Sequence, residues 1–292
     1  MGLPMAKHLL INNHEVYVYN RTSTKAMDLV KEFPSSCHVI SSSDEDIQRV
    51  LADQSIGIII SMLFDYQNIV DVVFQNLDKL GGSPLSGKVF IQMSTISVEQ
   101  SARLDELTGR CGGEFIEAPV LGTNTVAIAG KLQVLLGCSK ELFERVESLN
   151  VLQNFGSLKH VGEKSKAIKM KLSLNFLVAS LTGVLANSIS LVQSNDLDVN
   201  MYADIVRDSA LYFKYFDMKL PRLLNHDYSD MNFSVNGIVK DLDCIEKMAE
   251  DSKVNTNLIS TIKNLYEQAG NRDEQIKGQE DFASVFEIMK KE

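Results

Sequence analysis

A lysine and an asparagine one helical turn apart are the side chains of this sequence best suited to proton transfer. The stretch KSKAIKMKLSLNFLVAS contains Lys171 and Asn175, and a spacing of four places both on one face of a helix. Lys171 borders apolar positions, so its ammonium group could donate a proton into a cleft between domains or extend over an apolar surface to solvent. The spacing alone favours the second interpretation.

A basic turn follows the first strand-like segment, which covers residues 14–20. Asn20, Arg21 and Thr22 stand where dinucleotide-binding domains contact the adenosine ribose. Arg21 offers a planar, permanently charged group that suits a 2′-phosphate, and Asn20 carries no charge that would repel it. The alternative is a solvated turn with a helix N-cap at Thr22 or Ser23.

Two further segments follow strand-like runs. Ser94 and Thr95 end the apolar run of residues 88–95, where they could meet a ligand at the carboxyl edge of a parallel sheet or cap a helix starting near residue 98. The segment EAPVLGTNTVAIAGKL is rich in small residues, and Gly122 and Gly130 would allow a ligand to approach the backbone closely. Its alternative is a flexible connection.

The first residues read as a helix that precedes any strand. In a dinucleotide-binding unit, the opening strand ends in GxGxxG, and the next helix places its N-terminus on the pyrophosphate. Here Gly2 could be the last of those glycines, with the strand and the earlier glycines absent, or it could belong to an ordinary N-terminal helix. Loss of that central strand would expose the edges of its neighbours, so we expect the natural protein to begin upstream.

The elements that position these residues form two domains. Apolar runs at residues 55–63, 88–95, 114–119 and 132–137 alternate with helical stretches at 44–52, 67–80 and 98–110, which predicts a parallel sheet covered on both faces. From residue 162 the pattern is helical almost throughout. We therefore predict an α/β domain over residues 1–161 and an all-helical domain over residues 162–292, which begins with one long helix.

The composition limits the classes of function. The net charge of −9 argues against nonspecific binding to nucleic acid and against docking on anionic membranes. The sequence contains no run of 18 apolar residues, so we expect no membrane-spanning helix. The four cysteines are scattered, which indicates reduced thiols rather than disulfides or a metal site. We expect a cytoplasmic protein, or an organellar one if its start is incomplete.

Together these motifs resemble the β-hydroxyacid dehydrogenase family, which includes 3-hydroxyisobutyrate dehydrogenase and the glyoxylate/succinic semialdehyde reductases. The resemblance covers essentially the whole chain, in order and at the expected spacing. It rests on MGLPMAKHL, YNRTS, SMLFD, QMSTIS, EAPVLGT, HVGEKSKAIKMKLSLN, IVKDLD and GQEDFASV. One such motif is weak evidence, whereas the full set in register favours the family over the alternatives given for each motif.

The resemblance implies a Rossmann-type NAD(P)-binding domain, incomplete at its start, followed by a helical domain. It also implies reversible hydride transfer between NAD(P)H and a small hydroxy acid or its aldehyde or keto acid. Lys171 matches the catalytic lysine, which would protonate the carbonyl oxygen during reduction, and Asn175 would orient it or hold the substrate. Matches to cofactor contacts are Gly2, Asn20, Arg21, Thr22, Met62, Leu63, Thr95 and Lys240. Matches to substrate contacts are Ser94, Leu121, Gly122, Thr123, Lys171 and Asn175.

The details of the resemblance refine these expectations. Arg21 favours NADP(H), with NAD(H) as the alternative, and KMKL around Lys171 is similar to the glyoxylate-reductase branch. The family also implies a homodimer or homotetramer. Leu121 replaces the usual serine of the substrate loop, which leaves the substrate open. With the incomplete start, Leu121 supports the alternative of a catalytically weak scaffold or binding module, whereas Lys171 supports an enzyme.

Overall fold

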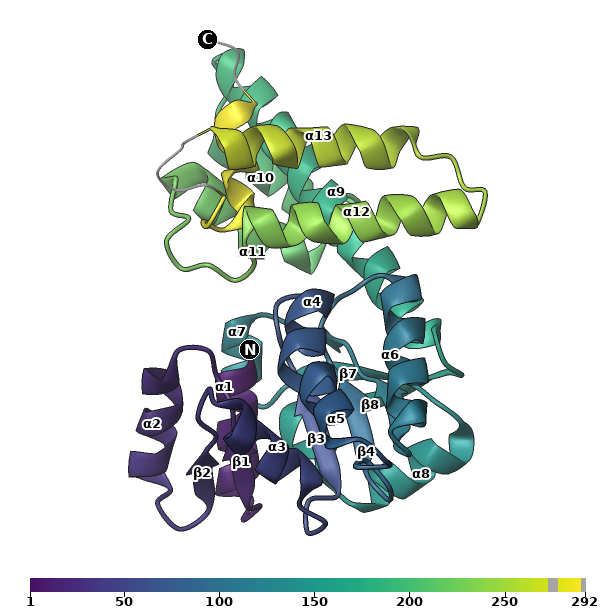
Figure 1. The fold of residues 1–292 in the computed structure, drawn as a ribbon. Helices are drawn as coiled ribbons and strands as arrows, with labels where there is room; N and C mark the ends of the chain where they lie inside the picture. The colour runs from purple at the N-terminus through teal and green to yellow at the C-terminus, as the bar shows by residue number, and fades with distance from the viewer. Residues whose placement is uncertain (273–277, 290–292) are drawn as a thin grey trace. The chain divides into compact units, whose positions relative to one another are not determined.

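The structure, a computed structural model, describes residues 1–272 and 278–289 and divides into two compact units (Figure 1). The units are Met1–Lys171 and Leu172–Glu292. The boundary predicted from the sequence, after residue 161, precedes the long helix α9 (Lys166–Ser194), whereas the division by contacts falls inside this helix.

The first unit alternates strands and helices, as the sequence predicted. Its elements in chain order are α1 (Gly2–Ile11), β1 (Val16–Val18), α2 (Ser23–Glu32), β2 (Cys37–Val39), α3 (Asp44–Ala52), β3 (Ile58–Ser61), α4 (Tyr66–Ile69), the π-helical turn η1 (Val70–Phe74), α5 (Gln75–Leu80), β4 (Val89–Gln92), α6 (Val98–Arg110), β5 (Glu114–Glu117), β6 (Val120–Leu121), α7 (Asn124–Ile128), β7 (Leu132–Gly137), α8 (Lys140–Ser148), the 3₁₀ turn η2 (Leu152–Phe155) and β8 (Gly156–Gly162). The start of α9 completes this unit.

The larger sheet has the strand order β3-β4-β5-β7-β6, with β8 paired to β7. Strands β3, β4 and β5 run parallel, but β7 is antiparallel to both β5 and β6. The prediction of one parallel sheet is therefore wrong for β7. An apolar run shows that a strand is buried, but buried strands of either direction have the same composition, so direction has to come from the connections.

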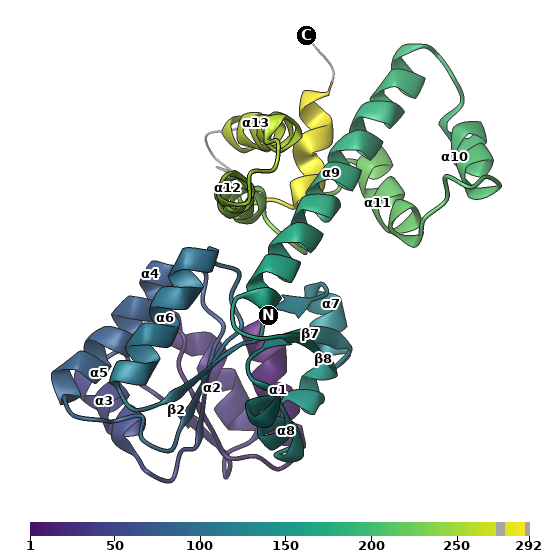
Figure 2. The same ribbon diagram turned by 90° about the vertical axis from the view of Figure 1, so that its right-hand side faces the viewer.

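Helices cover both faces of this sheet, as predicted (Figure 2). On one face, Met5 and Leu9 of α1 and Val146 of α8 belong to a buried cluster with the side chains of β4, β5 and β7. On the other face, Phe74 of η1 packs edge-on against Phe90 of β4, with ring centroids 5.3 Å apart. These buried side chains pack on both faces of the sheet. Because β3 and β4 are parallel neighbours, their carboxyl ends lie together at the same edge of the sheet.

Strands β1 and β2 form a separate parallel pair, so the strands of the first unit lie in two sheets. The backbone N–H of Val16 and the carbonyl oxygen of Val18 form hydrogen bonds to the β2 segment. In a parallel pair of strands, alternate residues bond to the neighbour, so the backbone N–H and C=O groups of Tyr17 point away from β2. By the same alternation, those of Ile58 and Ile60 in β3 face away from β4. Among the described residues, no strand pairs with either edge. The open edges predicted from the sequence are present, and β1 and most of β3 are only half-buried.

The second unit is helical, as predicted. It contains the rest of α9, α10 (Val199–Arg207), α11 (Lys214–Asn225), α12 (Val235–Asp251), α13 (Asn257–Asn271) and the 3₁₀ segment η3 (Phe282–Ile288). Helices α12 and α13 run side by side as a hairpin (Figure 1). Tyr266 of α13 is fully buried, and its hydroxyl donates to the carbonyl oxygen of Ala179 in α9 at 3.0 Å, which ties the hairpin to the long helix.

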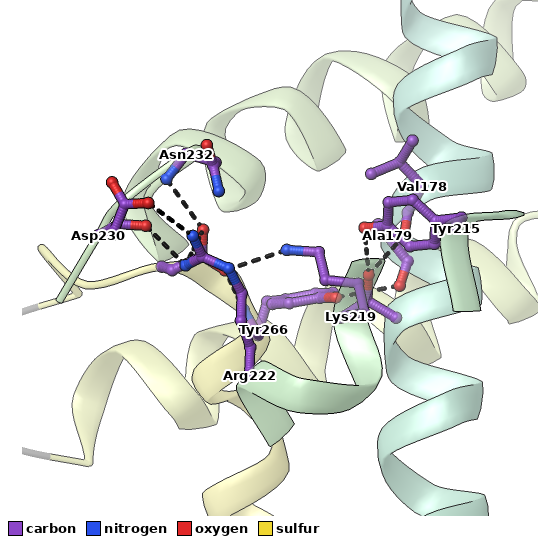
Figure 3. Close-up of polar contacts among 11 residues, drawn as sticks. Val178, Ala179, Tyr215, Lys219, Arg222, Asp230, Asn232 and Tyr266 are labelled. Atoms are coloured by element: carbon purple, nitrogen blue, oxygen red, sulfur yellow. Dashed lines mark hydrogen bonds and ion pairs between the residues drawn. The ribbon is translucent and has the colours of Figure 1, made fainter. Parts of the chain in front are cut away.

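A buried ion pair fixes the chain before η3 (Figure 3). Lys219 of α11 lies 3.1 Å from the Oδ1 atom of Asp281 and 3.9 Å from the ring centre of Phe282. The other carboxylate oxygen of Asp281 accepts from the backbone N–H of Asn232 at 3.0 Å. Arg222 lies 3.7 Å from Asp281 and also pairs with the exposed Asp230. Because Lys219 and Asp281 are almost inaccessible to solvent, each charge depends on the other.

Among the described helices, α9 is the one long and apolar enough to cross a membrane when judged by length and composition alone. Half of its most apolar window is buried inside the protein. Core helices of globular proteins meet the same criterion, so this helix is weak evidence for a membrane span.

Candidate functional site

The N-terminus of α1 lies beside the loop that follows β3. A Cβ atom placed on Gly2 would lie 3.8 Å from the Cβ atom of Met62, so these two predicted cofactor residues are neighbours. In the described part of the chain, no side chain caps this end of α1. The N–H groups of Gly2 and Leu3 therefore keep their capacity to bind an anion such as a phosphate, whereas Pro4 in the same turn has no N–H.

The turn after β1 is exposed. Asn20 donates from Nδ2 to the carbonyl oxygen of Thr22 at 2.6 Å, and Thr22 is the N-cap residue of α2. Thr22 thus occupies the predicted N-cap position, but its side chain forms no capping hydrogen bond with the helix. Arg21 lies exposed at the same turn, so a phosphate contact by its guanidinium group is compatible with the cap.

A serine joins the loops that follow β3 and β4. The backbone N–H of Leu63 donates to the Oγ atom of Ser94 at 2.9 Å, and Gln92 donates from Nε2 to the carbonyl oxygen of Ser94 at 2.7 Å. Ser94 is buried, whereas Thr95 is half-buried. The alternative interpretation of these two residues, a cap for α6, is wrong, because Ser97 occupies the N-cap position and forms a capping box with Gln100.

The predicted substrate loop is ordered by a short strand and a short helix, so its interpretation as a flexible connection is wrong. Leu121 pairs with Gln133 across β6 and β7, and the hydroxyl of Thr123 accepts from the N–H of Val126 at the start of α7. Gly122 has φ 144°, and a Cβ atom there would lie 2.7 Å from the side chain of Leu132. Glycine is therefore required where the chain turns out of β6.

A buried glutamate that we did not assign from the sequence holds the first turn of α9. Glu117 ends β5 with 2% of its surface exposed. Its carboxylate accepts from the hydroxyl of Ser101 at 2.6 Å and from the N–H of Ile168 at 3.3 Å. Burial raises the pKa of Glu117, and these hydrogen bonds oppose the shift. Gly137 makes room for it, since a Cβ atom there would lie 2.8 Å from the Oε2 atom.

Lys171 and Asn175 lie one turn apart on α9, as predicted. Lys171 is half-buried, whereas Asn175 is buried and donates from Nδ2 to the Oδ2 atom of Asp241 in α12 at 2.5 Å. The Oδ1 atom of Asp241 lies 2.9 Å from the Nζ atom of Lys240. One carboxylate thus bridges two of the predicted site residues. Asp241 lies in the segment IVKDLD, but it is 66 residues from Asn175 along the chain, so no local pattern predicts this contact.

The predicted residues therefore fall into local groups. Gly2 with Met62 and Leu63 with Ser94 lie at the carboxyl edge of the larger sheet, and Asn175 joins Lys240 through Asp241. The turn at Arg21 belongs to the smaller sheet. Among residues 1–272 and 278–289, no three histidine, cysteine or acidic side chains are grouped so that they could hold a metal ion.

These groups fit a dinucleotide. The uncapped N-terminus of α1 suits a pyrophosphate, the exposed arginine suits the adenosine end, and the loops at the carboxyl ends of β3 and β4 lie where ligands bind in such sheets. An α/β unit of this kind, followed by a helical unit and with a lysine near the start of the long helix that connects them, is typical of NAD(P)-dependent oxidoreductases.

Comparison with known proteins identifies the family. Residues 1–165 match the NAD-binding domain of 6-phosphogluconate dehydrogenase, and residues 166–289 match the NAD-binding domain of NADP-dependent 3-hydroxyisobutyrate dehydrogenase. The chain belongs to the β-hydroxyacid dehydrogenase family, as the sequence motifs predicted.

Individual relatives extend over most of the chain. Glyoxylate/succinic semialdehyde reductase 1 of Arabidopsis thaliana is 29% identical over 99% of this chain and 95% of its own length. The uncharacterized oxidoreductase YfjR of Bacillus subtilis is 34% identical over 73% of this chain and 70% of its own length. The structure of 3-hydroxyisobutyrate dehydrogenase from Mycobacterium tuberculosis superimposes with a TM-score of 0.81 at 19% identity, covering 100% of this chain and 96% of that one, which shows the shared fold.

Proposed function

We propose that this chain is an NADPH-preferring reductase of small aldehyde or keto acids of the glyoxylate or succinic semialdehyde class, with Lys171 as the general acid. The observation that carries the proposal is the pair Lys171 and Asn175 on α9, with Asn175 fixed by a buried carboxylate. The names of the Arabidopsis relatives, at 28% and 29% identity, support the substrate class. The exposed Arg21 supports the preference for NADPH.

The proposed mechanism assigns each residue a limited task. A bound nicotinamide would supply the hydride. Lys171 would hold its ammonium group at the carbonyl oxygen of the substrate, give up a proton as negative charge develops there, and stabilise that charge until the transfer is complete. Asn175 would keep its side-chain orientation because Asp241 accepts one of its amide protons. Gly122 and Thr123 would offer backbone and hydroxyl donors to the substrate carboxylate, while the side chain of Leu121 contributes no donor.

The binding part of the proposal is tested by fluorescence titration. The chain contains no tryptophan, so the emission of bound NADPH can be followed with little interference from the protein. We expect saturable binding of NADPH and weaker binding of NADH. Binding of equal strength would contradict the role of Arg21. The titration is repeated with a fusion that places a strand and GxGxxG before Met1, which measures how much the open edges of β1 and β3 cost in affinity.

The catalytic part is tested by turnover with glyoxylate, succinic semialdehyde and 3-hydroxyisobutyrate. We expect Lys171→Ala to lower kcat by about 100-fold or more, since general acid catalysis typically contributes that much. Lys166→Ala is the matched control, because Lys166 is an exposed lysine on the same helix, and its rate should stay at the wild-type value. An unchanged rate in Lys171→Ala would refute the mechanism. NADPH binding without turnover of any of these substrates would instead support the scaffold alternative.

A further inference from the structure

A histidine in the first helix forms hydrogen bonds with the end of a distant short helix. The Nε2 atom of His8 in α1 lies 3.0 Å from the carbonyl oxygen of Ala127 and 3.0 Å from that of Ile128, at the end of α7. Because both neighbours are acceptors, we assign the hydrogen to Nε2, where one neutral tautomer and the charged ring both carry it. His8 is therefore a donor shared by two carbonyl groups that lie 119 and 120 residues further along the chain.

The last turn of α7 is a suitable place for such a donor. The final carbonyl groups of a helix have no donor within the helix, and they carry a partial negative charge. In α7 the N–H group of Gly130 donates to the carbonyl oxygen of Ala127 at 3.1 Å, and that of Lys131 donates to the preceding carbonyl. His8 adds a side-chain donor to this end of the helix, so α7 is fixed to α1 as well as to the chain that follows it.

Gly130 leaves space for the ring of His8. It has φ 63°, and a Cβ atom placed there would lie 3.0 Å from the Cε1 atom of His8. Both the left-handed backbone and the short distance favour glycine at this position. The sequence predicted that Gly130 allows a ligand to approach the backbone closely, whereas in the structure the group that approaches it is the imidazole of His8.

Each of the two helices carries a proposed binding group at its other end. The N–H groups of Gly2 and Leu3 begin α1, about 9 Å along the helix axis from His8. Thr123 is the N-cap residue of α7, and its carbonyl oxygen accepts from the N–H of Ala127 at 3.0 Å. The contact of His8 thus connects the helix proposed to bind the pyrophosphate with the loop proposed to bind the substrate carboxylate. Both belong to the first unit.

Apolar packing brings α1 and α7 together independently of this histidine (Figure 2). Met5 of α1 and Ala127 of α7 are buried in the same cluster, so the two helices should stay packed when the imidazole is removed. Apolar contacts have little directional preference, whereas a hydrogen bond requires a defined distance and angle. Loss of His8 should therefore change the position of α7 more than it changes folding.

We propose that His8 is a positioning residue, which holds the substrate loop in place relative to the N-terminus of α1. The inference rests on the proposed function, which supplies the ligands at the two ends of the contact. Loss of His8 should weaken substrate binding and leave the proton donor Lys171 unchanged. Bound NADPH should also stabilise α7 against local opening, because it restrains α1 and His8 connects the two helices.

The first test requires no catalysis. Amide hydrogen exchange of residues 123–130 is compared in the wild type, His8→Ala and His8→Gln, with and without NADPH. Exchange should be about 10-fold faster in His8→Ala, as loss of one hydrogen bond predicts. His8→Gln should restore most of the protection, because the Nε2 atom of glutamine is also a donor and lies at a similar distance from Cβ. NADPH should slow exchange in the wild type and in His8→Gln, but not in His8→Ala.

Two results of this test would overturn the inference. One is equal exchange in all three proteins, which would show that His8 does not hold α7. The other is equal protection by NADPH in the wild type and in His8→Ala, which would show that the connection to the cofactor does not pass through this residue. A wild type that binds no NADPH would contradict the proposed function and the positioning role with it, while the rates without NADPH would still measure the contact between His8 and α7.

The second test separates binding from chemistry. In His8→Ala the KM for glyoxylate or succinic semialdehyde should rise about 10-fold while kcat stays within about twofold, since only binding is weakened. His8→Gln should return KM to near the wild-type value. Lys7→Ala is the matched control, because Lys7 is the neighbouring residue of α1 and pairs with Glu32 at the surface, and both constants should stay unchanged. An unchanged KM in His8→Ala, together with an inactive Lys171→Ala, would refute the role of His8 and leave the proposed function standing.

Discussion

Replacing Glu117 with alanine should destabilise the first unit and disturb the start of α9. The change leaves two buried donors without an acceptor, the hydroxyl of Ser101 and the N–H of Ile168. Each buried unsatisfied donor costs about 1–3 kcal/mol, which gives about 2–6 kcal/mol for the two. Removing a carboxylate that burial disfavours offsets part of this cost, so we expect the free energy of unfolding to fall by about 2–4 kcal/mol.

The assay is urea unfolding followed by circular dichroism, with amide exchange of β4 and β5 identifying the transition of the first unit. Glu114→Ala is the control, because Glu114 starts the same strand but is exposed and pairs with Arg145 at the surface. A surface ion pair contributes about 0–1 kcal/mol. If both variants lose the same stability, the carboxylate of Glu117 does not hold α9. If Lys171 is the proton donor, kcat should also fall in Glu117→Ala and stay unchanged in Glu114→Ala.

Three further predictions concern pH, cofactor choice and the second unit. Because the pKa of folded Glu117 is raised above its ordinary value of 4.5, the folded state binds the proton more tightly, and the wild type should lose stability as pH rises from 4.5 through the raised pKa. Glu117→Gln should remove this slope in unfolding curves measured from pH 4 to pH 8, and an unchanged slope would assign it to another group. Arg21→Ala should weaken NADPH binding by about 10–100-fold, as the loss of a hydrogen bond from a charged donor predicts, and leave NADH binding unchanged in the same titration. Asp281→Ala should cost the second unit about 3–5 kcal/mol, because Lys219 would remain buried without its partner, whereas Asp230→Ala at the exposed side of Arg222 should cost about 1 kcal/mol or less in urea unfolding.

Much of the fold could be predicted from local pattern. The apolar runs located β3, β4, β5 and β7, and the predicted helices at 44–52 and 98–110 have the bounds of α3 and α6. The signals for these elements lie within a few residues of one another, as with Ser97 and Gln100 at the start of α6. What the pattern could not supply was the direction of β7 or the ordering of the loop at Gly122, because both depend on how separate segments meet.

The sequence allowed individual candidate site residues to be named, but it did not predict which side chains form hydrogen bonds with one another. Arg21 could be chosen because its chemistry suits a phosphate contact, whereas Lys171 and Asn175 were assigned their roles from the resemblance to the family, since spacing alone favoured a solvent-exposed lysine. Glu117 could not, because its partner Ile168 is remote in sequence and the strand segment EFIEAP contains no signal that the second glutamate is buried. The same holds for Asp241, whose contact with Asn175 spans two helices.

The division of the first unit into two sheets affects how a cofactor would bind. The smaller sheet has two strands of three residues each, and Leu10, Leu29 and Cys37 form the buried cluster beneath it. A pair this short is marginal by itself, so local opening of this region should require less energy than opening of β4 or β5. Arg21 lies on that region. Binding of its proposed ligand would therefore stabilise the β1–β2 region against local opening. Part of the binding free energy would be used to order this region. The affinity for the adenosine end of the cofactor would then depend on the local stability of the smaller sheet.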